Sequence, residues 1–138
     1  MVQVILEPPI ITNKNMKIDR QKIHNKYNGH CAYCGKEITI KQMQVDHIQA
    51  KWNTWSEAEI NRRPGFVRGS DEECNLNPSC ARCNKWKSTF SVEEFRREIQ
   101  MQTERLRRDS SAYRMALDFN LVKEQDGVVI FYFETVNY

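Results

Sequence analysis

Two short stretches decide the fold: Cys31-Ala-Tyr-Cys34-Gly35 and Cys80-Ala-Arg-Cys83-Asn84-Lys85-Trp86-Lys87. In each stretch a two-residue spacer lets two thiolates reach one metal ion from a tight turn, and two such pairs complete a tetrahedral zinc site. A redox role for the pairs is disfavoured, because the chain lacks a thioredoxin-like βαβ pattern. We therefore predict a structural zinc held by Cys31, Cys34, Cys80 and Cys83.

Three further residues could take part in metal binding. Cys74 is the fifth cysteine and is expected to be a buried, inert thiol, because using it in place of Cys80 would sacrifice the two-residue spacer. His30 adjoins Cys31 and could substitute for a ligand, although four cysteines already fill a zinc site. His24 is expected to be an ordinary side chain of a short helix.

The chain of 138 residues is 40% hydrophobic and 28% charged, which suits a single folded domain with a modest core. No apolar run approaches the ~18 residues that span a bilayer. The start, Met1-Val-Gln-Val-Ile-Leu-Glu7, has no basic segment ahead of its apolar residues and so does not read as a signal peptide. We expect a cytoplasmic protein with no membrane partner.

The local patterns predict an α+β fold. Asp19, Ser56 and Ser91 stand where helix N-caps are expected, and the latter two are followed by an acid at the third position, as in a capping box. In the first half of the chain we expect an edge strand and linker in 1–17, a helix over 19–27, β-rich pieces at 37–40 and 43–48, and an irregular segment over 49–73. In the second half we expect a helix that begins at Cys80, a long charged helix after Ser91, a helix over 110–119 and a closing hairpin over 121–133. The long helix would carry Phe95, Ile99 and Leu106 on its apolar stripe.

Positive charge is concentrated in residues 82–108, which hold eight basic and four acidic side chains. Such a segment suits a polyanion such as nucleic acid. The charge pattern fits equally well a solvated helix face in which Glu and Arg pair at helical spacing.

Between the cysteine pairs lie Val45-Asp46-His47-Ile48 and Asn75-Leu76, and Asn84 directly follows Cys83. In this order, with the cysteines, the chain resembles the HNH endonucleases, or ββα-metal nucleases, in the subgroup with paired zinc cysteines. The resemblance covers roughly residues 20–90. It departs from the named motif at Asn84, which takes the place of the final histidine, and in the 27 residues that separate His47 from Asn75.

The resemblance implies a single domain over 1–138. Its zinc-stabilised ββα core would lie at about 20–90, and 91–138 would add helices and a C-terminal β-hairpin. His47 would be the general base, Asn75 would brace its loop, and Asp46 and Asn84 would hold a catalytic Mg²⁺ or Mn²⁺. The chemistry is consistent, since an imidazole titrates near neutral pH and both metal ligands are hard oxygens.

The expected substrate is DNA, and the tail resembles phage-borne or mobile-element members. One active site would nick one strand, so double-strand cleavage would need a dimer, successive cuts or partner proteins. The alternative is a non-catalytic, zinc-stabilised nucleic-acid-binding module. Trp52, Trp55 and Trp86 are expected to pack rather than stack on bases. The residues expected to contact nucleic acid are Arg82, Lys85, Lys87, Arg96 and Arg97.

Overall fold

The centre of the molecule is a two-stranded antiparallel sheet followed by a helix. The computed structural model describes residues 17–136, so the strand expected in 1–17 lies almost wholly outside the described residues. Strand β1 (Gln44–His47) pairs with β2 (Leu76–Ser79), with Asp46 opposite Asn77 and His47 opposite Leu76. Helix α3 (Ala81–Lys87) begins directly after β2. This confirms the predicted α+β class and the ββα order. The β-rich piece expected at 37–40 is reduced to a single bridge between His30 and Glu37.

The predicted helix caps are present. The Asp19 carboxylate accepts the Lys22 amide at the start of α1 (Arg20–Asn25). Ser56 and Ser91 form capping boxes at α2 (Glu57–Asn61) and α4 (Val92–Gln100). These caps satisfy amides that the first helical turn leaves without a partner. The helix expected over 110–119 forms as α6 (Ser111–Asp118), where the Ser110 side chain accepts the Tyr113 amide.

The core lies where the cysteine turns, α1 and α4 meet the sheet. Tyr33 is at its centre and makes edge-to-face contacts with Phe95 of α4 and Phe131 of the C-terminal segment. Phe95 and Phe131 are each 1% exposed and stack on each other. Segments far apart in the chain therefore share one small core.

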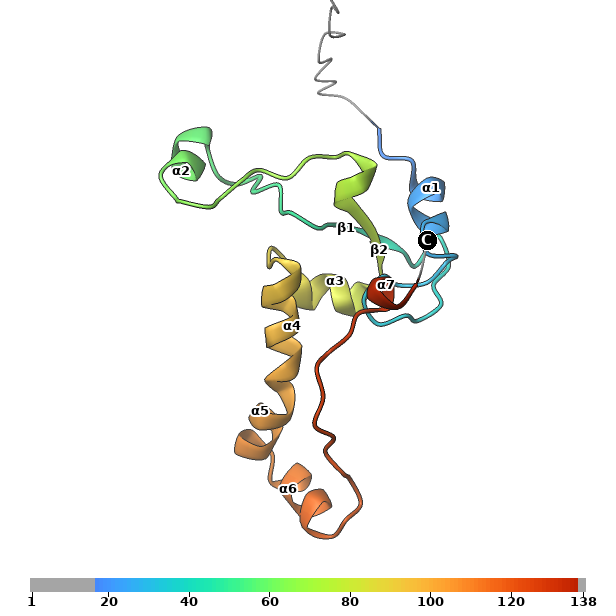
Figure 1. Cartoon of the computed structure of the whole chain (residues 1–138), viewed down its shortest axis with the longest axis vertical. Helices are drawn as coiled ribbons and strands as arrows, with labels where there is room; N and C mark the ends of the chain where they lie inside the picture. The colour runs from blue at the N-terminus through green and yellow to red at the C-terminus, as the bar shows by residue number, and fades with distance from the viewer. Residues whose placement is uncertain (1–16, 137–138) are drawn as a thin grey trace, which may run out of the picture.

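An arm formed by residues 50–68 projects from this core between β1 and the 3₁₀ turn η1 (Glu73–Asn75). Figure 1 shows it extending away from the sheet with α2 at its tip. At its root, Gly69 donates to the Ala50 carbonyl, and a Cβ at Gly69 would lie 1.8 Å from the Gln49 carbonyl oxygen. Only glycine fits this approach of the two chain segments.

The prediction of one long helix after Ser91 was wrong. The helix breaks at Met101 into α4 and α5 (Gln102–Asp109), which is followed by α6. Phe95 is buried and Ile99 packs against the core, whereas Leu106 is 43% exposed. The polar Gln102 interrupts the apolar stripe, so α5 has little apolar surface to pack on the core, and α4 and α5 are joined by polar contacts such as the Arg105–Glu98 ion pair.

The predicted C-terminal hairpin was also wrong. Residues 119–122 form a turn after α6, and residues 123–131 return along α4 without forming a strand and lead into α7 (Tyr132–Thr135), as Figure 1 shows. The alternation that suggested a strand is real, since Val128 and Ile130 are exposed while Phe131 is buried. The inward side chains pack on the core and on α4 instead of pairing with a second strand. Among residues 17–136, no helix combines the length and apolarity needed to cross a bilayer.

Candidate active site and cysteine cluster

The four cysteines of the two pairs converge. The Sγ atoms of Cys31, Cys34, Cys80 and Cys83 all lie within 4.8 Å of one another, and those of Cys34 and Cys80 are 3.9 Å apart. Thiolates on a tetrahedral zinc, with Zn–S bonds of about 2.3 Å, are separated by about 3.8 Å. The cluster can therefore hold a structural zinc with little rearrangement.

Local structure builds each half of the cluster. Gly35 closes the first turn with a φ of +75°, and a Cβ there would lie 2.8 Å from the Tyr132 ring. Cys80 is the N-cap of α3, and its sulfur accepts the Cys83 amide. Hydrogen bonding from Cys83 and from nearby backbone amides lowers the pKa of Cys31 to about 4, and the same contact raises the pKa of Cys83, so Cys31 is the first of the two to ionise.

The other metal-site candidates lie outside this cluster. The His24 Nε2 is 2.7 Å from the Ile38 carbonyl, and the His30 ring stacks on Tyr132. The expectation that Cys74 is buried was wrong, because its side chain is exposed beside Glu72 in the 3₁₀ turn. Cys74 lies in a 3₁₀ turn at the surface, so its side chain does not reach the hydrophobic core.

His47 ends β1 and is held by a residue that the sequence did not single out. Its Nε2 lies 2.7 Å from Oδ1 of Asp71, and Oδ2 of Asp71 accepts Lys51 at 2.8 Å. Because a carboxylate only accepts hydrogen bonds, Nε2 carries a proton and the neutral ring has its lone pair on Nδ1. The hydrogen bonds from Lys51 and then His47 lower the pKa of Asp71, so it stays ionised at neutral pH.

Asp71 was missed because its partner His47 is 24 residues away along the chain. It precedes Asn75 at the end of the insertion, beside Glu72 and Glu73. That position is a weak signal, since nothing in the sequence distinguishes Asp71 from the two acids that follow it.

Asn75 joins the two ends of the arm. Its Nδ2 donates to the carbonyls of Gln49 and Ser70, and its Oδ1 accepts the Gln49 amide at 2.8 Å. Its own carbonyl accepts the Ile48 amide. The chain directly after His47 is thereby fixed against the chain that carries Asp71.

Asp46 points away from His47, into the core. It is 3% exposed, its Oδ2 accepts the Tyr33 hydroxyl, and its Oδ1 lies 3.2 Å from the Lys87 ammonium. Burial raises the pKa of Asp46, although Lys87 and Tyr33 act in the opposite direction. Lys87 also donates to the carbonyls of His47 and Ile48 and is fully buried. The prediction that Lys87 contacts nucleic acid is therefore wrong as the structure places it: its ammonium secures the end of β1.

Asn84, on α3, faces the same groove as His47. Its Nδ2 donates to the Gln44 side chain, which leaves Oδ1 available as an acceptor. The groove has a volume of about 790 Å³, and its lining includes Asp46, His47, Asn84 and Lys85 together with Trp52 and Trp55 of the arm. His47 and Asn84 thus border one groove with Asp46, whose carboxylate faces the core and is held there by Tyr33 and Lys87.

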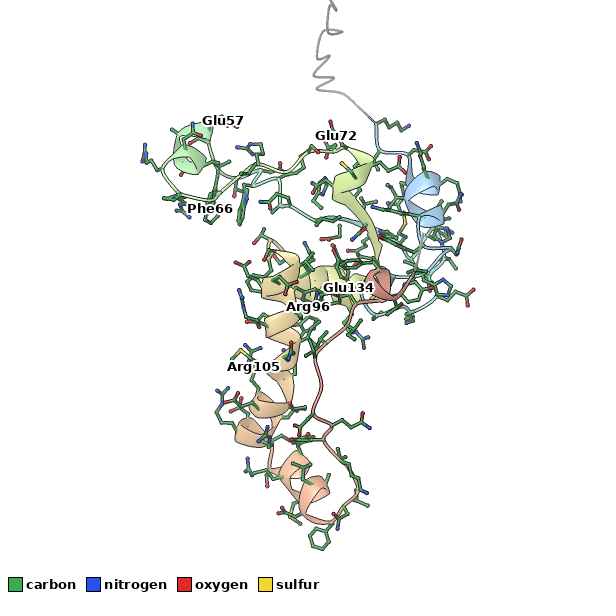
Figure 2. The ribbon with its side chains drawn as sticks, in the orientation of Figure 1. Glu57, Phe66, Glu72, Arg96, Arg105 and Glu134 are labelled. Atoms are coloured by element: carbon green, nitrogen blue, oxygen red, sulfur yellow. The ribbon has the colours of Figure 1, made fainter. Side chains whose placement is uncertain are left out.

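The predicted nucleic-acid contacts divide into two groups. Arg82, Lys85 and Arg97 are exposed and, within residues 17–136, have no acidic partner. Arg96 is different: it pairs with Glu93 and Glu134, lies over the Phe131 ring and donates to the Val129 carbonyl. Figure 2 shows Arg96 and Glu134 together beside the core. Its guanidinium secures the C-terminal segment, and a contact of Arg96 with nucleic acid stays a prediction.

Most of the remaining basic side chains of α4 and α5 are also paired with acids. Arg105 pairs with Glu98, Arg107 with Glu124, and Arg108 with Asp109. The distribution favours the solvated, internally paired helix face over a continuous phosphate track.

Comparison with known proteins finds a family match over part of the chain. Residues 31–90 match the family model described as HNH endonuclease. Among solved structures, the Type II-C Cas9 enzyme from Actinomyces naeslundii is similar with a TM-score of 0.44 and 25% identity, over 58% of this chain and 8% of the Cas9 chain. No curated protein matches. Residues 31–90 are thus similar to an HNH endonuclease domain, and the four cysteines clustered there could hold a zinc ion.

Proposed function

We propose that this protein is a metal-dependent DNA endonuclease whose general base is His47. The observation that carries the proposal is the Lys51–Asp71–His47 chain of hydrogen bonds at the mouth of a groove shared with Asn84. A histidine that is held by an ionised carboxylate, and whose second nitrogen has no hydrogen-bond partner among residues 17–136, is an arrangement suited to general-base chemistry.

Each side chain then has a role in hydrolysis. Nδ1 of His47 takes the proton from a water that attacks the phosphorus, and Asp71 stabilises the imidazolium that results. Lys51 keeps Asp71 ionised and oriented. Asn75 and Lys87 fix the backbone after His47 and so limit its movement during the reaction.

The donor chemistry of Asp46 and Asn84 fits a hard divalent cation. A carboxylate and an amide oxygen, with water and phosphate completing the shell, suit Mg²⁺ or Mn²⁺. When bound, such an ion would supply charge stabilisation at the phosphate and the leaving oxygen. Asp46 would meet it with one lone pair of an oxygen that already accepts Lys87 or Tyr33.

The proposal is tested by incubating the protein with supercoiled plasmid under different divalent metals. We expect nicked circles with Mg²⁺ and Mn²⁺, weak activity with Zn²⁺ or Ni²⁺, and most activity lost in Asn84→Ala. Relaxed product that forms best in Ni²⁺ or Zn²⁺, or an Asn84→Ala variant as fast as wild type, would remove Asn84 from the metal site. Binding without cleavage under every metal would instead support the non-catalytic module.

A further inference from the structure

Two grooves meet at the proposed active site. The first, the arm groove, is the one bounded by Trp52, Asn53, Thr54 and Trp55 of the arm and by Lys85, Ser88 and Thr89 on the opposite wall. The second, the α1 groove, is lined by Lys17, Ile18 and Arg20 and extends over Gln44. Val45, His47 and Asn84 belong to both linings. The proposed base therefore lies where the two grooves join.

The charge along the joined grooves is positive. Their linings contain Lys17, Arg20, Lys85 and Lys51, the last of which is paired with Asp71, against a single lining carboxylate, Asp46. That carboxylate is buried and already neutralised by Lys87. Asn53, Thr54, Ser88 and Thr89 add side chains that hydrogen-bond to phosphate oxygens in other proteins. A polyanion is the ligand that this lining fits.

The arm is built as a rigid wall rather than a loose loop. Trp52 and Trp55 stack with their ring centroids 4.8 Å apart, Phe66 packs on both, and the Arg63 guanidinium lies 3.8 Å from the Trp55 centroid. Arg68 donates to the carbonyls of Lys51, Trp52 and Trp55 and pairs with Glu57. Figure 2 shows Glu57 and Phe66 near the arm's outer end.

The same contacts indicate how the arm would meet a substrate. The tryptophan rings are occupied by one another, by Phe66 and by Arg63, so they form the arm's own small core instead of a platform for unstacked bases. Besides Val45, Ala50, His47 and the two tryptophans, the groove is lined by short polar side chains and ammonium groups, which suit contact with a phosphate backbone.

We propose that the two grooves form one path for the phosphodiester backbone of duplex DNA. The arm contacts the duplex on one side of the scissile phosphate, and residues 17–20 contact it on the other. This inference rests on the proposed nuclease function and assigns a role to the insertion between His47 and Asn75, which widens the binding surface beyond the ββα core.

Site-specific crosslinking tests the path. A photoreactive benzophenone amino acid is placed at Thr54 of the arm groove, at Lys17 of the α1 groove, and at Val128, an exposed control position outside both grooves. Each full-length variant is irradiated with a short DNA duplex. We expect DNA crosslinks from positions 54 and 17 and background yield from 128.

Affinity measured against salt gives a second readout. Lys17→Ala and Lys85→Ala should each weaken duplex binding about fivefold at 0.15 M salt and reduce the salt slope by about 1, as expected for one lost phosphate contact. Lys123→Ala, an exposed lysine in the C-terminal segment, should change neither quantity.

The outcomes separate this inference from the function on which it rests. If the protein nicks DNA but position 54 or position 17 crosslinks no better than 128, the two-sided path is wrong and the nuclease proposal stands. If single-stranded DNA crosslinks at both positions and duplex does not, the duplex assignment is overturned. If wild type neither binds nor cuts DNA under any divalent metal, both proposals fail together.

Discussion

Lys85 and Lys87 lie two residues apart on α3 and have different surroundings. Both were expected at the nucleic acid, but a spacing of two residues places side chains on roughly opposite faces of a helix. Lys85 faces the groove, whereas Lys87 is buried against Asp46 and two backbone carbonyls. The sequence could not distinguish them, because the buried acid that requires Lys87 lies 41 residues earlier in the chain.

The two lysines therefore give opposite predictions. Lys87→Met should lower the free energy of unfolding by about 3–5 kcal/mol, because it leaves the Asp46 carboxylate buried without its counter-charge. Lys85→Met should leave stability nearly unchanged and weaken DNA binding. Urea unfolding and duplex titration of both variants check this. Equal stability of the two variants would show that the buried pair is not needed for the fold.

Asp71 gives a prediction that depends on pH. Its pKa is lowered in the folded protein, so its contribution to stability is present above the unfolded value of about 3.9 and is lost as pH falls through the folded pKa. Asp71→Asn should thus be less stable than wild type at pH 6, and the difference should shrink below pH 4. Urea midpoints at several pH values measure it. A difference that persisted unchanged to pH 3 would contradict the ion pairing of Asp71.

At the scale of helices and strands, local sequence signals predicted helix starts correctly, whereas they did not predict how distant segments pack together. The capping residues Asp19, Ser56 and Ser91 predicted three helix starts, because a cap satisfies amides within its own turn. The prediction of a C-terminal hairpin was wrong because Phe131 packs in the core against Tyr33 and Phe95. The arm was recognised as an insertion, but its fixed shape depends on aromatic and guanidinium contacts that no local pattern reveals.

The narrow root of the arm can be tested at Gly69. Gly69→Ala places a methyl group against the Gln49 carbonyl, so the root must open, and overpacking of this kind costs about 1–3 kcal/mol. Because Lys51 and Asp71 lie on either side of that root, we expect nicking to fall as well. Gly127→Ala is the matched control, since a Cβ there meets nothing within 4 Å. Equal activity of the two variants would separate the arm from the active site.

At the scale of the whole molecule, the cysteine cluster adjoins and extends a small hydrophobic core that includes Tyr33, Phe95 and Phe131. The paired spacing predicted the cysteine cluster correctly because chelation is a local requirement, and the two pairs meet across 45 intervening residues. The candidate active-site residues His47, Asn75, Asp46 and Asn84 were proposed through the family resemblance. The contacts of Asp71 with His47 and Lys51 could not be proposed in that way, because they form only when the insertion folds back on β1.

The zinc prediction follows from this architecture. Freshly purified protein should hold one tightly bound zinc, and Cys34→Ser or a strong chelator should unfold the core, because metal binding here supplies folding free energy. Metal analysis and circular dichroism measure both effects. Cys74→Ser is the control and should change neither, since Cys74 lies outside the cluster. A folded protein that contains no zinc would defeat the prediction.

The central claim is that the cysteine cluster supports the fold while His47 performs the chemistry, and one paired measurement tests it most directly. Wild type and His47→Ala are purified in parallel, their zinc content is measured, and the same preparations are incubated with supercoiled plasmid and Mg²⁺. We predict one zinc per chain and comparable DNA affinity in both proteins, with nicking confined to wild type. Nicking by His47→Ala at a rate comparable to wild type would contradict the account.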